Sequence, residues 1–355
     1  MPRHFARAFV VVFLFASAAI AQPPAPTHKI VATDRQTVAA TITYKVNTTR
    51  FAVTRWMVFL PEPPELPSQG MVKTTGDAGT KIVTEKSSLA RTVRYLEVSI
   101  AKPVPGGGLS LKLEVEATLR SRKLVELQTG EAPLAVAALT AAEKKYYLSP
   151  TTRVDHDAKP VQDWLTAKTL RLGKNEAPID FAARVLEVIR ADYTYHYDAD
   201  KDTRASIACK ASHTDCGGMT YLFVAAMRAS GVPARVLVGR QAISRKPGTT
   251  AAQQEYDRPH VRAELYAAGV GWVPVDPAYA RSSKNRPVAS FVGFDPGDLL
   301  VLHVDVDLQL PYPGKVREAP LLQIGPHYWT AGNGTFDGYF GPTGWEMKVT
   351  PSEKK

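Results

Sequence analysis

Apolar and polar positions alternate along much of the chain before residue 128. Four segments show the period of two that places successive side chains on opposite faces of a strand, at 41–46, 51–59, 92–100 and 109–117. Turn-forming clusters at 61–70 and 103–108 separate these segments. Several short strands joined by turns are typical of an antiparallel β-sandwich. The pattern therefore predicts a β-sandwich domain over residues 29–128, in which we find no His or Cys that could carry chemistry.

The pattern changes after an Ala-rich, weakly helical linker at residues 129–145. Helical spacing of apolar residues follows in segments near 161–172, 178–189 and 216–229. Short strand-like runs lie among and after them, at 234–240, 260–267 and 272–277. Alternating strands return in the last part of the chain. The expected fold class is therefore α+β, with a mixed core at 146–280 and a β-rich C-terminal extension at 281–355.

The helix that begins at Cys216 contains a stripe of apolar residues. Its members recur at helical spacing and are Met219, Leu222, Phe223, Ala226 and Met227. Gly217 and Gly218 are poor helix formers, so their place in the first turn needs another reason, such as close packing or substrate access to the sulfur. A thiol at a helix N-terminus lies near the positive end of the helix dipole, which favours the thiolate.

The first residues have the pattern of a secretory signal peptide. Arg3 and Arg7 precede an apolar run at 8–20, and Ala19-Ile-Ala21 fits a small-x-small cleavage site. The sequence predicts a signal peptide at 1–21, a Pro/Ala-rich leader at 22–28, and a periplasmic or secreted protein after cleavage near Ala21. No later segment has 18 uninterrupted apolar residues, so we expect no stable membrane insertion.

The charge of the chain does not indicate a nucleic-acid site. The formal net charge is +10, but the basic residues are spread along the sequence with no long Lys/Arg run. A basic surface in contact with water explains this distribution. We therefore expect no nucleic-acid partner.

Cys216, His260 and Asp276 supply the three roles of a thiol acyl-transfer site. A sulfur attacks a carbonyl, an imidazole accepts its proton, and a carboxylate orients the imidazole. If residues 268–270 form an odd-length hairpin loop, Ala267 pairs with Gly271, and His260 and Asp276 fall diagonally on one face. An even-length loop would place them on opposite faces. The polar face of this strand carries His260, Arg262, Glu264 and Tyr266, and is the face expected to form a site.

Three ordered motifs resemble the core of the transglutaminase-like superfamily. They are Asp215-Cys-Gly-Gly218 with Arg228-Ala-Ser-Gly-Val-Pro-Ala-Arg235, His260 followed by Glu264, and Gly271-Trp-Val-Pro-Val-Asp-Pro277. The resemblance covers roughly residues 145–280 and implies a papain-like α+β core with Cys216 as the nucleophile. The N-terminal domain is similar to the β domain that precedes this core in many exported bacterial relatives. The family often has a Trp two residues after the His, whereas Arg262 stands here, and this difference bears on the acyl-group specificity.

Further residues are candidates for contact with the oxyanion or the substrate. The backbone N–H of Cys216 is the natural first oxyanion donor, because it lies at the helix start. The other candidates are Tyr195, Tyr197, Gly217, Arg262 and Trp272. Loops 198–215 and 244–258 are expected to frame the cleft.

The same residues allow other interpretations. Cys209 and Cys216 are seven positions apart and could form a disulfide in an oxidising compartment. Cys209, His213 and Cys216 could bind zinc together with His260, although their spacing is irregular. Asp276 before Pro277 could initiate a turn, and Arg262 and Glu264 could form an ion pair on one face. The aspartates of the C-terminal part match no calcium-binding loop and are assigned to strands and turns.

The sequence thus predicts an exported cysteine-dependent enzyme that acts on peptide or protein amide bonds through a thioester. Hydrolysis and transamidation need the same three residues, so both remain open. The expected partner is a peptide or protein substrate, for example a peptide of the cell envelope, and no cofactor or metal is expected. The alternative is a non-catalytic envelope module that binds peptide or glycan on the same fold.

Overall fold

The computed structural model describes most of the chain. The described residues are 26–47, 52–198, 200–242, 259–283, 285–323, 327–332, 337–339 and 344–351. The signal peptide predicted at 1–21, most of the leader and the loop predicted at 244–258 lie outside these residues. Among the described residues, no helix has the length and apolar character needed to cross a bilayer.

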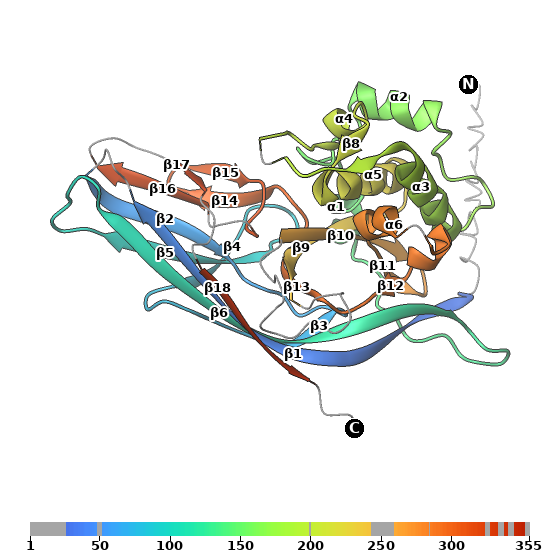
Figure 1. Ribbon diagram of the computed structural model, residues 1–355, viewed down its shortest axis with the longest axis horizontal. Helices are drawn as coiled ribbons and strands as arrows, with labels where there is room; N and C mark the ends of the chain where they lie inside the picture. Colours follow the sequence, from blue (N-terminus) through green and yellow to red (C-terminus); the bar gives the residue numbers. More distant parts are fainter. Residues whose placement is uncertain are drawn as a thin grey trace, which may run out of the picture.

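Two antiparallel sheets pack face to face in the part of the molecule drawn at the left of Figure 1. Strands from the first part of the chain provide their frame: β1 (His28–Asn47), β2 (Val53–Pro61), β3 (Gln69–Gly76), β4 (Lys81–Thr84), β5 (Thr92–Ser99) and β6 (Gly108–Glu126). Alternate residues of these strands point inward and form a shared core that includes Ile42, Trp56 and Leu113. The alternation in the sequence reflects this burial of one face of each sheet.

Strands from the C-terminal part complete both sheets of the sandwich. They are β12 (Phe294–Asp295), β16 (His327–Gly332), β17 (Asp337–Tyr339) and β18 (Gly344–Pro351). β18 pairs with β1, β16 pairs with β2, and β12 pairs with β6. The residues predicted as an extension at 281–355 are therefore β-rich, but their strands are hydrogen-bonded into the N-terminal sheets. The other domain boundaries given above stay predictions.

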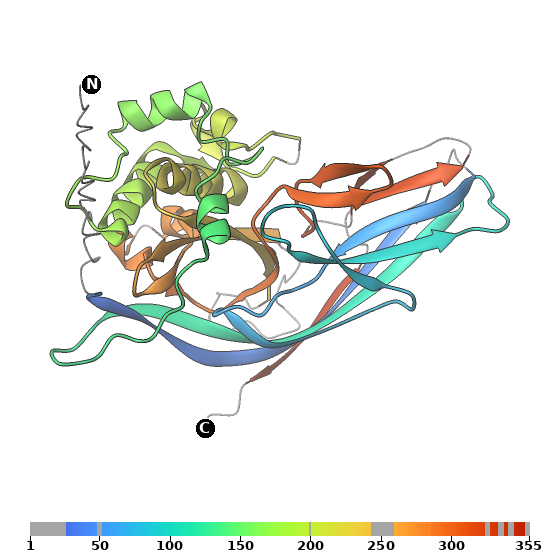
Figure 2. The ribbon, with the colours of Figure 1, turned by 180° about the vertical axis from the view of Figure 1, so that it is seen from behind.

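β1 and β6 extend well beyond the sandwich. They contain 20 and 19 residues, which corresponds to about 60 Å of extended chain. Both views of the ribbon show them running under the helical part of the molecule as well as under the other sheet (Figures 1 and 2). The end of β6 therefore reaches the core, and Arg122 near this end pairs with Asp295 of β12.

The core consists of a small antiparallel sheet with helices on one face (Figure 1). The sheet has the order β11-β10-β9-β13 and contains β9 (Ala234–Gln241), β10 (Pro259–Ala267), β11 (Gly271–Val275) and β13 (Leu299–Val304). The helices are α1 (Ala141–Tyr146), α2 (Lys159–Ala167), α3 (Pro178–Asp192), α4 (Ala205–Ala208), α5 (Cys216–Ala229) and α6 (Pro277–Ser282), followed by the 3₁₀ helix η2 (Val288–Phe291). The remaining strands form the parallel pair β7 (Thr194–Tyr195) and β8 (His213–Thr214) and the hairpin β14 (Leu308–Tyr312) and β15 (Lys315–Ala319). The predicted α+β class is confirmed.

Two predicted helical segments differ from the structure. The segment predicted near 161–172 ends earlier, because α2 stops at Ala167 and Thr169 has a positive φ of 54°. The linker is not uniformly weakly helical, since α1 forms only over its last residues and continues into Tyr146. Thr140 and Glu143 form a capping box at its start.

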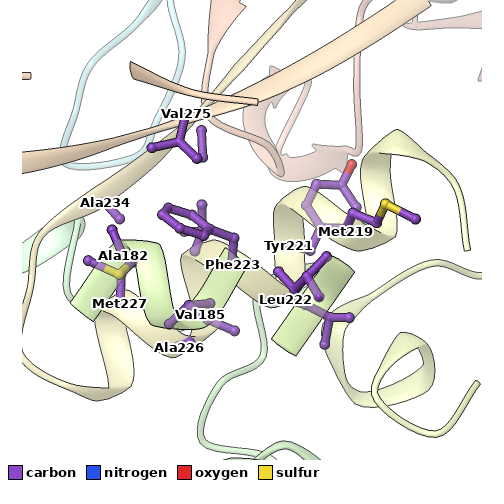
Figure 3. Packing of buried hydrophobic residues seen from close by; sticks show 14 of the residues in the cluster. Ala182, Val185, Met219, Tyr221, Leu222, Phe223, Ala226, Met227, Ala234 and Val275 are labelled. Atoms are coloured by element: carbon purple, nitrogen blue, oxygen red, sulfur yellow. The ribbon is translucent and has the colours of Figure 1, made fainter. Parts of the chain in front are cut away.

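α5 is buried on every side rather than along one stripe. Its residues from Cys216 to Arg228 are all buried, because α3, α4, α6 and the sheet surround it. In Figure 3, Phe223 lies between Val185 of α3 and Val275 of β11. A helix that is mostly apolar on all faces is typical of a protein interior. The packing around the helix therefore holds its first residue, Cys216, in place.

Gly239 lies where β9 packs tightly against β13. A Cβ atom at this position would lie 2.1 Å from the backbone oxygen of Leu300. Gly239 is also the backbone partner of His260 on β10. Only a residue without a side chain allows the two strands to approach in this way.

We predict that Gly239→Ala lowers the free energy of unfolding by about 3 kcal/mol, because backbone atoms must move to make room. Gly173→Ala is the matched control, since its nearest neighbour would lie at 3.4 Å in ordinary contact. Urea denaturation of both variants measures the effect. Equal midpoints for the two variants would contradict the prediction.

Candidate active site

Cys216 is the first residue of α5, and the loop before it determines where the helix begins. The Asp215 side chain caps the helix and accepts a hydrogen bond from the Gly218 amide at 2.9 Å. A Cβ at Gly218 would lie 1.9 Å from the hydroxyl of Thr214, so close packing requires glycine there. Gly217 instead faces a cleft beside the sulfur. Close packing therefore explains Gly218, and substrate access at Gly217 stays a prediction.

The register predicted for the β10–β11 hairpin is confirmed. Ala267 pairs with Gly271 and Ala263 pairs with Val275, as an odd-length loop requires. His260 and Asp276 consequently lie on the same face, and His260 Nε2 is 2.9 Å from Asp276 Oδ2. The Cys216 thiol lies within hydrogen-bonding reach of the same imidazole. Because Nε2 binds the carboxylate, Nδ1 is the ring nitrogen that can face the sulfur.

The Asp276 carboxylate accepts hydrogen bonds from several directions. Its Oδ1 accepts from the Tyr279 amide at 2.9 Å and caps α6. Its Oδ2 accepts from His260 and also from Arg262 Nε at 3.1 Å. Asp276 therefore initiates the first turn of α6, as one interpretation of the sequence proposed, and also binds His260, since the two interactions use different oxygens.

The electrostatic environment favours the protonated form of His260. Burial alone would lower the pKa of this imidazole, but the nearby Asp276 carboxylate, together with Cys216, raises the pKa to about 9. The neighbouring Asp215 responds differently, since burial raises the pKa of its carboxyl despite hydrogen bonds from the Gly218 and Gly217 amides. The site therefore contains an imidazolium that remains charged at neutral pH.

A cleft of about 350 Å³ opens beside Cys216. Most of its surface is apolar and comes from Tyr195, Tyr197, Tyr221, Pro259, Val261 and Leu321. A second hollow of about 340 Å³ shares Tyr197 and Leu321 with it and has a charged wall that includes Asp198, Lys201 and Asp202. The two hollows therefore adjoin, and the more apolar one lies next to the sulfur.

The structure places some predicted substrate-contact residues in this cleft and others elsewhere. Tyr195, Tyr197 and Gly217 line it. Arg262 and Trp272 are not among the described residues that line it. The Arg262 guanidinium is buried among carboxylates, and Trp272 packs under the guanidinium of Arg235 at 3.9 Å.

The polar face predicted on β10 is covered rather than exposed. His260, Arg262 and Glu264 are all buried. Arg262 and Glu264 do not pair with each other, because each bonds to other partners. The alternative that they form an ion pair with each other is therefore not supported.

Sequence reasoning missed the contribution of the C-terminal part to the cleft. Leu321 and Gln323 follow β15 and line the cleft together with residues of α5 and β10. Tyr221 was also missed as a lining residue, whereas Thr203 belongs to the loop at 198–215 that was expected to frame the cleft. Tyr221 lies on α5 one turn after Gly217, so helical spacing could have indicated it. No sequence signal indicates Leu321.

The alternative interpretations of the cysteines find no support in the described residues. Cys209 and Cys216 are both free thiols, and the Cys209 sulfur donates to the backbone oxygen of Ser206. His213 contacts Lys201 through Nε2 at 2.9 Å. The described residues contain no group of three or more side chains placed to hold a metal ion.

Comparison with known proteins bears on the fold of the core. Residues 166–277 match the model of the transglutaminase-like superfamily. A solved structure described as a "putative cysteine protease" from Cytophaga hutchinsonii aligns with a TM-score of 0.53 and 12% identity, over 92% of this chain and 94% of that chain. The periplasmic domain of TgpA from Pseudomonas aeruginosa aligns with a TM-score of 0.34 and 14% identity, over 70% of this chain and 91% of that chain. Comparison with curated proteins found no match. The predicted transglutaminase-like core is confirmed.

We predict that folding stability falls as the pH rises from about 6.5 to about 9. The pKa of His260 lies above the value of 6.5 expected in the unfolded chain, so its contribution is fully present below pH 6.5 and is lost as the pH rises through 9. Urea denaturation across this range measures the slope for the wild type and for His260→Gln. Identical slopes for the two proteins would contradict the prediction.

Proposed function

We propose, from the transglutaminase-like core that residues 166–277 form, that this protein is a cysteine-dependent enzyme that acts on peptide or protein amide bonds. The observation that carries the proposal is the arrangement of three side chains at one end of the cleft. His260 contacts both the Cys216 thiol and the Asp276 carboxylate. Such an arrangement supplies a nucleophile, a proton acceptor and an orienting group.

The proposed reaction has two steps. In the first, the Cys216 sulfur forms a bond with the substrate carbonyl carbon, the carbon–nitrogen bond breaks, and the amine leaves with a proton from His260. In the second, water or another amine gives a proton to His260 and attacks the thioester, which releases the acyl group and restores the thiol. Asp276 keeps the imidazole oriented during both steps.

The first turn of α5 offers a donor for the developing oxyanion. The Asp215 carboxylate accepts hydrogen bonds from the amides of Gly217 and Gly218. The amide of Cys216 precedes them at the helix start, beside its own sulfur. We assign this amide to the oxyanion, because backbone donors at a helix N-terminus stabilise negative charge without rearrangement.

The shape of the cleft supports a substrate with an apolar side chain near the scissile bond. The wall next to the sulfur is made of tyrosine rings and aliphatic side chains, which favour aliphatic or aromatic groups. The charged lining of the adjoining hollow favours polar groups farther along a peptide. A peptide of the cell envelope is consistent with both, if the signal peptide proposed at 1–21 directs export.

We predict that iodoacetamide alkylates Cys216 at pH 6 at least tenfold faster than Cys209. Cys216 lies at the start of α5 and beside the His260 imidazole, a position typical of reactive thiols, whereas burial raises the pKa of the Cys209 thiol. Peptide mass spectrometry under reducing conditions follows both residues in the same molecule. His260→Ala should remove the difference between the two alkylation rates. Equal rates in the wild type would contradict the proposal that Cys216 is the nucleophile.

Trapping the acyl-enzyme then separates the proposed outcomes. The protein is incubated with a peptide library and an isotope-labelled primary amine, and the masses of the thioester and of the released peptides are measured. Incorporation of label indicates transamidation, and release of carboxylate indicates hydrolysis. Peptide binding without a thioester in a protein whose Cys216 is reactive would favour the non-catalytic binding module.

We predict that Leu321→Asp lowers kcat/KM at least tenfold for peptides with an apolar residue at the acyl donor, because it places a charge in the apolar wall. Val316→Asp is the matched control, since Val316 belongs to the same C-terminal part but is 48% exposed. Iodoacetamide labelling of Cys216 should change little in either variant. Unchanged kinetics for Leu321→Asp would exclude this wall as a specificity site.

A further inference from the structure

Buried ion pairs connect the sandwich, the core and the C-terminal part beside the thiol site. The members are Arg122 of β6, Arg235 of β9, Arg262 and Glu264 of β10, and Asp276, Asp295 and Asp298 at or just after the ends of β11 and β12. No side chain in this ion network is more than 8% exposed. Buried charges are unfavourable unless they are paired. The position of each member therefore depends on its partners.

Arg262 is the member that touches the proposed active site. Its Nε donates to Asp276 Oδ2 at 3.1 Å, the same oxygen that binds His260. Its Nη1 donates to Asp295 Oδ1 at 2.7 Å, and its Nη2 donates to Asp298 Oδ1. A planar guanidinium bound at all of its nitrogens cannot rotate without breaking an ion pair. Asp295 and Asp298 therefore fix the direction in which Arg262 meets Asp276.

Arg122 holds Asp295 from the side of the sandwich. Its Nη2 and Nε donate to Asp295 Oδ2 at 2.8 and 3.1 Å, and its Nη1 donates to Glu264 Oε1 at 2.5 Å. The other oxygen of Glu264 accepts from Arg235 Nε at 2.6 Å. A guanidinium from β6 thus bridges the C-terminal part and β10.

We propose that Arg262 is a positioning residue of the thiol site and that Arg122 and Asp298 act through it. The Asp276 carboxylate then keeps its correct orientation toward His260 only when the sandwich and the C-terminal part are both docked on the core. This inference rests on the proposed function, because it concerns the same site. It adds residues that lie outside the region matched by the family model, 166–277.

Other charged groups face His260 as well. Asp276 approaches from the junction of β11 and α6, and Cys216 and Asp215 approach from the start of α5. On the adjacent strand β9, Arg240 is the backbone partner of Pro259 and donates to the backbone oxygen of Gln323. Asp298 does not contact His260 directly: it binds Arg262, which binds Asp276, which binds His260. A substitution of Asp298 therefore leaves all the groups that face His260 in the protein.

The test compares Asp298→Asn with Asp305→Asn in the full chain. Both substitutions remove one buried carboxylate that binds an arginine Nη2, in Asp298–Arg262 and in Asp305–Arg228. Only the first pair belongs to the ion network. Two quantities are measured: the pH at which His260 titrates, by NMR with His260→Gln for assignment, and the rate of Cys216 alkylation at pH 6.

Asp298→Asn should lower the titration midpoint of His260 by about one pH unit and slow alkylation up to about tenfold. Both loss of the nearby negative charge and looser positioning of Asp276 act in this direction. Asp305→Asn should change neither the titration midpoint of His260 nor the alkylation rate of Cys216, even if it lowers the free energy of unfolding as much as Asp298→Asn does. Equal behaviour of the two variants would overturn the inference.

Arg122→Lys provides a second test if Asp298→Asn fails to fold. Lysine keeps the positive charge but has one ammonium group in place of the fork that binds both Glu264 and Asp295. Slower alkylation of Cys216 in this variant supports the link to the sandwich, and an unchanged rate contradicts it. A wild-type protein whose Cys216 reacts like an ordinary thiol would instead refute the proposed function itself.

Discussion

The Asp276 carboxylate is buried, and the local structure around it depends on the donors that hold it there. The Tyr279 amide binds one oxygen, and His260 and Arg262 share the other. Losing any of these donors would leave a buried charge poorly compensated. The residue that ends the β10–β11 hairpin and caps α6 is thus the residue that orients the imidazole. Folding of this corner of the core and assembly of the site are the same event.

The ion network extends this dependence to the rest of the molecule. β6 is long enough to leave the sandwich and bring Arg122 under the core. The C-terminal part contributes Asp295 and Asp298 to the network and Leu321 to the cleft wall. If the sandwich separated from the core, each of them would keep buried charges without partners, which is unfavourable. The sandwich and the core are therefore better described as one cooperative structure than as independent modules.

The proximity of His260 and Asp276 could be predicted because their relation is local. The register of the β10–β11 hairpin follows from the length of its loop and a period of two, and the odd-length loop found here places His260 and Asp276 on one face. Polarity alone, however, suggests that Arg262 faces a substrate. A polar strand face has the same sequence pattern whether water or other buried charges cover it. Arg122 is separated from Glu264 by 142 positions, and no local pattern reveals a contact across such a distance.

The pairing of β18 with β1 has a consequence for how the chain acquires its structure. The two strands lie roughly 300 residues apart in sequence, so their contact closes a very long loop. Such non-local contacts slow folding, because chain entropy is lost before the contacts form. During this interval the outer edges of β1 and β2 have no strand beside them. Unpaired edges readily pair with other molecules, so the slow closure of the sandwich is the stage at which this protein is most exposed to aggregation.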